Sequence, residues 1–431
     1  MKNKVNIGII GFGTIGSSVV KLLLERRKFF RERTGIDLNL SIVCDKDLKS
    51  KRDVSVPKGM FTKDVDRVIS DLEIDIVVEL IGGIHPAKEI IIKSLCSGKH
   101  VVTANKYLLA AEGDDVFKQA EENKRQVLFE ASVAGGVPIV KAIREGMAAN
   151  TFSSILGILN GTSNYILSQM STEGTSFKAA LKEAQKKGYA EKDPSLDIKG
   201  LDSAHKLSIL SFLAFGKRVS MNEIHVEGIE NISPLDIKYA AELGYVVKLL
   251  AIAKRYGKEL EIRVHPTLLP SENLLSSVSG IYNAIFVDAD LVGKQVFYGE
   301  GAGKLPAASA VLSDIMGLAY TIVYCNESNK YVAPERAEID KVRKMDDVSA
   351  RYYVHFSAID KPGVLAQIAD LLGQYNISIS SVVQKERRAG QIIPIIMLTH
   401  EARERDMQDA LKKINRLKTI KRKSVFIRLE K

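Results

Sequence analysis

The sequence predicts an α/β protein in three parts: a doubly wound parallel sheet over residues 1–135, an α+β domain over 136–345, and a ferredoxin-like α+β domain over 349–431. Three observations lead to this prediction. A glycine-rich turn joins a strand to a helix near the N-terminus, apolar strands then alternate with helical segments, and the C-terminal part has the order βαββαβ. A chain of 431 residues is also too long for one ordinary domain.

Composition indicates a soluble, globular protein. Hydrophobic residues make up 45% and charged residues 26% of the chain. There is no signal-peptide pattern and no stretch near the roughly 18 uninterrupted apolar residues of a membrane span, so we expect a cytoplasmic protein without a membrane partner. Cys44, Cys96 and Cys325 lie in apolar contexts, which favours buried, reduced thiols over disulfides or a zinc site.

The net charge of +10 raises the question of nucleic-acid binding. Most of the excess is one local cluster, because residues 412–431 contain nine Lys or Arg and a single acid, Glu430. Apart from Phe426 the cluster lacks aromatic residues for base stacking. A solvated face or a docking surface is therefore favoured, and no nucleic-acid partner is expected.

A glycine-rich motif follows the first predicted strand, 5–10, and precedes a helical pattern over 17–33. The motif consists of Gly11, Phe12, Gly13, Thr14, Ile15 and Gly16. In this context its first glycine permits a tight turn, its second lets the backbone approach a pyrophosphate, and its third lets helix and strand pack closely. The motif predicts a Rossmann-type dinucleotide site, and the alternative is a chance glycine-rich turn.

Coenzyme choice depends on the end of the second predicted strand, 38–43. Asp45 could hold a ribose 2′-hydroxyl, which favours NAD. Four basic residues nearby could instead accept a 2′-phosphate: Lys46, Lys49, Lys51 and Arg52. We favour NADP(H), with NAD(H) as the alternative.

Two later strand ends carry polar residues, and ligands of such a sheet gather at the carboxyl ends of its strands. Lys106 follows the predicted strand 100–103, where it is placed either near a nicotinamide or in an ordinary helix-capping turn. Glu130 lies in the predicted strand 127–131, before a run of small residues whose backbone carbonyls, with the carboxylate, could coordinate a hard cation. A plain interdomain turn is the alternative there.

The middle domain contains an unusually acidic stretch from Gly188 to Lys206. Its carboxylates are Glu191, Asp193, Asp197 and Asp202. Glycines and a proline indicate a loop, which leads into a helix whose start carries Asp202 and Lys206 four residues apart on one face. Taken alone, the stretch is typical of a solvated loop with a surface ion pair. A polar turn earlier in this domain, 160–164, is predicted to cap a helix that begins near Tyr165. A second glycine-rich segment, 299–311, does not fit a nucleotide-binding pattern and is predicted to return to the first domain.

Six separated blocks together resemble homoserine dehydrogenase in order and spacing: GFGTIGSS at Gly11, TANK at Thr103, EASVAGGVP at Glu130, LNGTSNYIL at Leu159, GYAEKDPSLDIKGLDSAHK at Gly188 and GEGAGKLPAASAV at Gly299. No aspartate kinase segment precedes the first block, so the resemblance is to the single-function form. It implies NAD(P)-linked interconversion of L-homoserine and L-aspartate 4-semialdehyde, in threonine, methionine and isoleucine biosynthesis.

The resemblance also implies roles for individual residues. The catalytic residues would be Lys206, as proton donor, and Lys106, near the nicotinamide. The substrate-binding residues would be Glu191, Asp202, Gly161, Thr162 and Asp197. Besides the glycine motif and Lys106, the coenzyme would contact Gly188 and Gly301. A structural sodium ion would be held by Glu130, Val133, Gly135 and Val137.

The C-terminal domain, with its DKPGVL turn at 360–365, resembles an ACT domain. The resemblance implies binding of an amino acid, L-threonine or another, where two such units pair, near Gly363, Asn376 and Ile377. A purely structural or dimerisation module is the alternative. We expect a homo-oligomer, a dimer or a tetramer.

Two other functions remain open from the sequence. One is an NAD(P)-dependent reductase of another small aldehyde, and the other is a non-catalytic, amino-acid-responsive dinucleotide-binding protein. The presence of lysines at 106 and 206 and of acids at 191 and 202 favours the enzyme.

Overall fold

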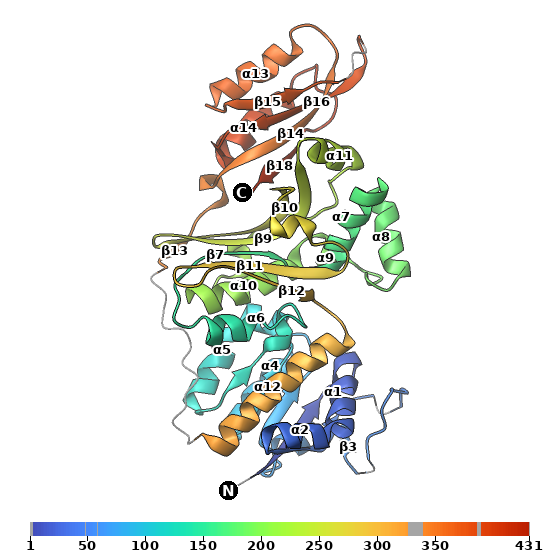
Figure 1. The fold of residues 1–431 in the computed structure, drawn as a ribbon, viewed down its shortest axis with the longest axis vertical. Helices are drawn as coiled ribbons and strands as arrows, with labels where there is room; N and C mark the ends of the chain where they lie inside the picture. Colours follow the sequence, from blue (N-terminus) through green and yellow to red (C-terminus); the bar gives the residue numbers. More distant parts are fainter. Residues whose placement is uncertain (1–2, 48, 58, 326–338, 386–388, 431) are drawn as a thin grey trace. The chain divides into compact units, whose positions relative to one another are not determined.

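The computed structural model describes residues 3–47, 49–57, 59–325, 339–385 and 389–430 (Figure 1). The chain divides into two compact units. The first contains the residues up to Thr151, His205–Met221 and a segment from Phe297, and the second contains Phe152–Ala204, Asn222–Val296 and the C-terminal part. Lys431, the C-terminal residue of the predicted third domain, lies outside the described residues, as do residues 326–338 of the predicted middle domain.

The first unit is built on a parallel sheet with the strand order β3-β2-β1-β4-β5-β6. Its strands are β1 (Lys4–Ile10), β2 (Asp37–Cys44), β3 (Phe61–Thr62), β4 (Ile76–Glu79), β5 (His100–Thr103) and β6 (Val127–Leu128). The predicted doubly wound parallel sheet is confirmed. One strand is shorter than predicted, because the chain leaves β6 and forms a 3₁₀ turn over Glu130–Ser132.

The helices that connect these strands are α1 (Thr14–Glu25), α2 (Arg27–Thr34), α3 (Asp66–Ile69), α4 (Ala87–Cys96) and α5 (Lys106–Glu122). The single helix expected over 17–33 is two helices, because Arg26 has non-helical dihedral angles. The expectation of buried thiols is wrong for Cys96, which is exposed at the last position of α4. Cys44, at the end of β2, is buried, whereas Cys325 is only half-buried.

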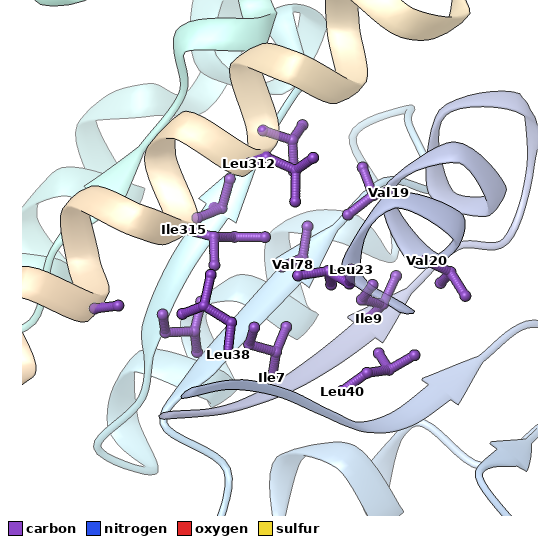
Figure 2. Packing of buried hydrophobic residues seen from close by; sticks show 14 of the residues in the cluster. Ile7, Ile9, Val19, Val20, Leu23, Leu38, Leu40, Val78, Leu312 and Ile315 are labelled. Atoms are coloured by element: carbon purple, nitrogen blue, oxygen red, sulfur yellow. The ribbon is translucent and has the colours of Figure 1, made fainter. Parts of the chain in front are cut away.

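Helix α12 (Lys304–Tyr324) completes the core of the first unit. Figure 2 shows Leu312 and Ile315 of α12 pointing toward Ile7, Leu38 and Val78 of the sheet. Each such apolar side chain contributes about 1.5–3 kcal/mol when fully buried. By length and composition this helix could also cross a membrane, but its packing in the core accounts for its apolar character.

The second unit contains a mixed sheet of 12 strands within the described residues, with the main order β12-β11-β7-β9-β10-β18-β14-β16-β15. Before the C-terminal domain its strands are β7 (Phe152–Ile158), β8 (His225–Val226), β9 (Tyr245–Tyr256), β10 (Glu259–Pro270), β11 (Tyr282–Ala289), β12 (Gly293–Glu300) and β13 (Lys341–Val342). The long strands β9 and β10 form an antiparallel pair at the centre. Strand β7 pairs with β9 and leads directly to the polar turn at Asn160.

The helices of the middle part of the chain are α6 (Ile139–Lys141), a π-helical turn (Ala142–Gly146), α7 (Gly161–Glu173), α8 (Phe177–Lys186), α9 (Ser195–Ile198), α10 (Leu201–Phe215) and α11 (Pro234–Glu242). Two of them differ from expectation. Helix α7 begins at Gly161 instead of near Tyr165, because Asn160 caps it. The acidic loop contains the short helix α9, which brings Asp197 into a helical turn.

The C-terminal part has the predicted βαββαβ order. It consists of β14 (Ser349–Ile359), α13 (Val364–Gln374), β15 (Ile379–Val383), β16 (Ile392–Thr399), a short strand β17 (Ala402–Arg403), α14 (Glu404–Ile414) and β18 (Val425–Leu429). Strand β18 also pairs in parallel with β10, with Arg428 opposite Thr267. The sheet of the C-terminal domain is therefore continuous with the sheet that leads to Asn160, which the sequence did not indicate.

Candidate active site

The packing of the chain requires glycine at two positions of the glycine motif, Gly11 and Gly16, but not at Gly13. Gly11 has φ +104°, and a Cβ there would lie 2.6 Å from the carbonyl carbon of Leu80. A Cβ at Gly16 would lie 2.0 Å from the carbonyl oxygen of Gly11. At Gly13 a Cβ would meet no described atom within 4 Å. The open space lies at the N-terminus of α1, whose backbone N–H groups favour an anion, so a pyrophosphate fits there.

Asp45 and Arg52 hold Phe12, the residue between the first two glycines of the motif, in place. Asp45 Oδ2 accepts a hydrogen bond of 2.6 Å from the backbone N–H of Phe12, and Asp45 Oδ1 accepts one of 2.8 Å from Asp47 N–H. The Arg52 guanidinium lies over the Phe12 ring at 5.1 Å, and Arg52 Nε donates to the Phe12 carbonyl at 3.0 Å. Both carboxylate oxygens of Asp45 are thus engaged by backbone groups. The basic side chain fixed against the motif is Arg52, whereas Lys46, Lys49 and Lys51 are exposed.

Lys106 is the first residue of α5. The turn before it is held by hydrogen bonds of Thr103 and Asn105. Asn105 caps the helix by accepting from Leu108 N–H at 3.1 Å, and its Nδ2 donates to the Gly83 carbonyl at 2.6 Å. Thr103 Oγ1 donates to Glu79 Oε2 at 2.6 Å, between the ends of β5 and β4. The capping turn therefore also fixes the start of the helix that carries Lys106. Sequence reasoning missed Glu79, although an acid that ends an apolar strand was a signal.

Two pairs of aromatic rings bring α10 into contact with α5 inside the first unit. The rings of Tyr107 and His205, the sequence neighbours of Lys106 and Lys206, contact edge-on with centroids 5.0 Å apart. Further along, Phe117 and Phe212 stack at 5.8 Å. Lys206 is 7% exposed. The structure therefore places both predicted catalytic lysines on two helices that touch next to them.

An asparagine joins two of the predicted substrate acids. Asn160 Nδ2 donates to Asp197 Oδ1 at 2.7 Å and to Asp202 Oδ2 at 2.9 Å. The other end of the amide, Asn160 Oδ1, accepts from Ser163 N–H at 2.8 Å and caps α7. Ser163 Oγ donates to the Asp197 carbonyl at 2.8 Å. We call Asn160, Asp197 and Asp202 the acid cluster. Sequence reasoning assigned the turn at Asn160 to capping and missed its second role.

Helix α7 also contacts the loop that carries Glu191. Thr162 Oγ1 donates to the Tyr189 carbonyl at 2.7 Å, and the rings of Tyr165 and Tyr189 lie 5.0 Å apart. A Cβ at Gly161 would lie 2.5 Å from the Ile281 carbonyl oxygen, so this position requires glycine. The structure thus brings the Gly161–Thr162 turn to the acidic loop.

Two predicted residues of that loop show weaker structural constraints. Glu191 is exposed, two residues beyond Tyr189 in the chain. Gly188 has φ +77°, a backbone conformation that favours glycine. A Cβ there would meet no described atom within 4 Å, so the backbone conformation and not crowding accounts for glycine at this position.

Glu130 begins the turn that was predicted to hold a cation. Its Oε1 accepts from Val140 N–H at 2.9 Å and its Oε2 from Lys141 N–H at 2.8 Å, which caps α6. Ala134 and Gly135 both have positive φ. A Cβ at Gly135 would lie 2.7 Å from the Gly301 carbonyl oxygen, so the turn and the second glycine-rich segment are in contact.

The chemistry of this turn fits a hard cation. Burial raises the pKa of Glu130, and it raises the pKa of Asp314, which accepts from Glu130 N–H at 2.8 Å, to about 7. Among the described residues, the buried carbonyls of Val133 and Gly135 accept no hydrogen bond from backbone N–H groups, whereas that of Val137 accepts from Ile139. The described part of the chain has no group of three or more His, Cys, Asp or Glu side chains arranged as metal ligands. Carbonyl oxygens beside one carboxylate are instead a donor set for a hard, oxygen-binding ion.

Comparison with known proteins covers nearly the whole chain. A family model described as homoserine dehydrogenase matches residues 138–316, one described as homoserine dehydrogenase, NAD binding domain, matches 11–130, and an ACT domain model matches 352–419. A homoserine dehydrogenase of Neisseria gonorrhoeae is 43% identical over 430 residues, covering 99% of this chain and 98% of the relative.

Solved structures agree with the sequence relatives. The crystal structure of a homoserine dehydrogenase from Thiobacillus denitrificans has a TM-score of 0.91 at 40% identity and covers 99% of this chain and 98% of that one. A hyperthermophilic archaeal homoserine dehydrogenase in complex with NADPH has a TM-score of 0.62 at 28% identity and covers 73% of this chain and 97% of that one.

Proposed function

Since this chain belongs to the homoserine dehydrogenase family of NAD(P)-dependent oxidoreductases, we propose that helix α10 carries both halves of its chemistry, with Asp202 recognising substrate and Lys206 transferring the proton. The reaction interconverts L-homoserine and L-aspartate 4-semialdehyde. The observation that carries the proposal is the position of α10. Its first turn belongs to the acid cluster, and His205, next to Lys206, contacts the start of α5.

The charge that develops during reduction explains the need for lysine. When bound, the coenzyme supplies a hydride to the aldehyde carbon, and negative charge then appears on the aldehyde oxygen. An ammonium group beside that oxygen stabilises the charge and delivers a proton to it. Lys206 is the proposed donor, and Lys106 supplies a second positive charge near the reacting oxygen.

The acid cluster is suited to the α-ammonium group that substrate and product share. Asp202 is 5% exposed, and a buried carboxylate attracts an ammonium more strongly than one in water. Asn160 donates to Asp197 and Asp202 and so holds the two carboxylates together against their mutual repulsion. Gly161, Thr162 and Glu191 complete the proposed substrate residues, with Glu191 on a more exposed loop.

NADP(H) is the proposed coenzyme, with NAD(H) as the alternative. The motif residues Gly11 to Gly16 would hold the pyrophosphate, and Gly188 and Gly301 would contact the coenzyme elsewhere. Arg52 is fixed against Phe12 and supplies a cation for a 2′-phosphate, whereas both oxygens of Asp45 already accept hydrogen bonds. The related archaeal enzyme in complex with NADPH supports the same choice.

A sodium ion is the proposed occupant of the turn at Glu130. Glu130 and the carbonyls of Val133, Gly135 and Val137 would hold it and offset the cost of burying the carboxylate. Its role would be structural, since it would fix the turn against the segment of Gly301.

The C-terminal ACT domain is proposed to bind an amino-acid effector, L-threonine or another, in a cytoplasmic homo-oligomer. Gly363, which precedes α13 with φ +86°, and Asn376, with φ +56°, are the backbone positions of interest, together with the buried Ile377. A chain shortened at residue 348 would remove β18 from β10, so the effector test should use the full chain. Inhibition by L-threonine that Asn376→Ala weakens would support the proposal.

The activity itself is tested by homoserine-dependent reduction of NADP and of NAD, followed by absorbance in separate cuvettes. We expect reduction of both, faster at low coenzyme concentration with NADP. A reductase of another small aldehyde would oxidise NADPH with that aldehyde and not with L-aspartate 4-semialdehyde. A non-catalytic binding protein would show no turnover with either coenzyme.

A further inference from the structure

Arg428 of β18 forms a buried ionic link between the C-terminal domain and an earlier part of the chain. Its guanidinium donates to both oxygens of Glu404, at 2.8 and 2.6 Å, and to both oxygens of Glu227, at 3.0 and 2.9 Å. The Arg428 side chain is 1% exposed. Glu404 begins α14 of the C-terminal domain, whereas Glu227 follows β8 in the middle part of the chain.

The segment after Glu227 lies backbone to backbone against the end of α9. Ile229 N–H donates to the Ile198 carbonyl at 2.9 Å. A Cβ at Gly228 would lie 2.4 Å from the same carbonyl oxygen and 2.8 Å from the Cα of Lys199. There is no space between the two segments at this point, so a shift of residues 227–229 must move the end of α9.

Helix α9 carries the acid cluster's Asp197, next to Ile198. The side chain of Asp197 accepts from Asn160, which also donates to Asp202, and the carbonyl of Asp197 accepts from Ser163. A continuous series of direct contacts therefore leads from Arg428 through Glu227 and Ile198 to the acid cluster.

We infer that Arg428 and Glu227 are positioning residues for substrate recognition, which set the place of Asp197 and hence the geometry of the acid cluster. The inference rests on the proposed role of that cluster in binding the substrate ammonium. It gives the C-terminal domain a part in forming the substrate site even without an effector. It also makes this link the route by which a change in α14 or β18 would alter substrate affinity.

Electrostatics explains why loss of Arg428 or Glu227 would displace the end of α9. Two carboxylates share one guanidinium, and without its charge Glu227 and Glu404 would repel each other. The Glu227 side chain is 33% exposed and can turn to solvent, whereas Glu404, 2% exposed, cannot do so easily. Glu227 is therefore the partner that would move, together with the segment that touches α9.

A second contact of the C-terminal domain provides a matched control. His355 of β14 meets Asp236 Oδ1 of α11 at 2.8 Å, and Tyr353 donates to the same oxygen at 3.1 Å. This contact also joins the C-terminal domain to the middle part of the chain and is buried, since Asp236 is fully buried. It reaches α11 and not the segment 227–229.

The experiment compares Glu227→Gln, Arg428→Lys and the control His355→Gln in the full chain. Glu227→Gln keeps the shape of the side chain and removes its charge. Arg428→Lys keeps the charge but has only three donors, all on one nitrogen, so it cannot make the four hydrogen bonds that the guanidinium makes to Glu227 and Glu404. For Glu227→Gln we expect KM for L-homoserine to rise roughly tenfold, with kcat and the coenzyme Kd changed less than about twofold. Arg428→Lys should raise KM less, and His355→Gln should lower the melting temperature without changing KM.

The inference is wrong if Glu227→Gln and Arg428→Lys leave KM for homoserine unchanged, or if His355→Gln raises it equally. Asp202→Ala separates this result from failure of the proposed function. If Asp202→Ala raises KM while the two link variants do not, the acid cluster binds substrate but Arg428 does not position it. If Asp202→Ala also leaves KM unchanged, the substrate role of the cluster fails, and the inference fails with it.

Discussion

The coenzyme edge of the first unit and the acid cluster of the second are assembled in different ways. The coenzyme edge rests on one short motif, in which Gly11 and Gly16 lie close enough for a side chain at one to strike the other. The acid cluster joins Asn160 to side chains 37 and 42 residues further along the chain. A change at the edge should therefore alter coenzyme binding alone, whereas a change in the cluster should alter substrate binding alone.

The largest expected effect tests whether the proton-transfer step depends on a different residue from coenzyme binding and substrate binding. Lys206→Ala should lower kcat by roughly 10²- to 10⁴-fold, because the developing oxyanion loses its proton donor. The coenzyme Kd, measured by the fluorescence of NADPH, should stay within about twofold. A fall in kcat that addition of more coenzyme restores would place Lys206 in coenzyme binding instead.

The next effect concerns the acid cluster. Asp202→Asn removes the charge that would meet the substrate ammonium, so KM for homoserine should rise roughly tenfold or more, since a hydrogen bond to a charged group contributes about 1.5–3 kcal/mol. Asn160→Ala should raise KM less, because both carboxylates remain while the amide that joins them is lost. Steady-state kinetics at saturating NADP measures both, and an unchanged KM in Asp202→Asn would contradict the assignment.

A pair of glycine variants tests the coenzyme edge. Gly13→Ala should fold with an unchanged melting temperature and bind NADPH about tenfold more weakly, because the new methyl group enters the space proposed for the pyrophosphate. Gly16→Ala should lower the melting temperature itself, since the methyl group would strike the Gly11 carbonyl. Equal effects of the two variants on folding would contradict this division.

Arg52 offers a test of coenzyme choice. Arg52→Ala should weaken NADPH binding by about tenfold, the effect of losing about 1.4 kcal/mol. NADH binding should change little, because NADH carries no 2′-phosphate. Titration of both coenzymes measures the difference, and equal weakening of the two would show that Arg52 acts through Phe12 and the glycine motif instead.

The smallest expected effect is on the free energy of unfolding. It concerns His100, which lies at the start of a strand in the parallel sheet, at the end opposite the coenzyme edge. Burial lowers the pKa of His100, the first residue of β5, from 6.5 to about 4. As the pH falls, the unfolded chain therefore binds this proton before the folded chain does. The contribution of His100 to the free energy of unfolding is complete above about pH 6.5 and is lost as the pH falls toward 4. His100→Asn should flatten this part of the stability profile, measured by denaturant unfolding, and leave the coenzyme Kd unchanged.

The same contrast explains what could be predicted from the sequence. The glycine motif, the strand end before Lys106, and helix α10 depend on neighbouring residues, and their elements were recognised. Asn160 was assigned only to capping, since its contacts with the two aspartates depend on how distant segments pack. The pairing of β18 with β10 was missed for the same reason, because the residues of β18 specify a strand but not its neighbour.

One measurement tests the central claim, that α10 recognises substrate in its first turn and transfers the proton one turn later. It is the single-turnover rate of NADPH oxidation by L-aspartate 4-semialdehyde in Lys206→Ala and Asp202→Ala, as a function of semialdehyde concentration. We predict that Lys206→Ala lowers the rate at saturation by roughly 10²-fold or more, whereas Asp202→Ala shifts the half-saturating concentration roughly tenfold and approaches the normal rate. If both variants lower the saturating rate equally, or both shift only the half-saturating concentration, the claim is wrong.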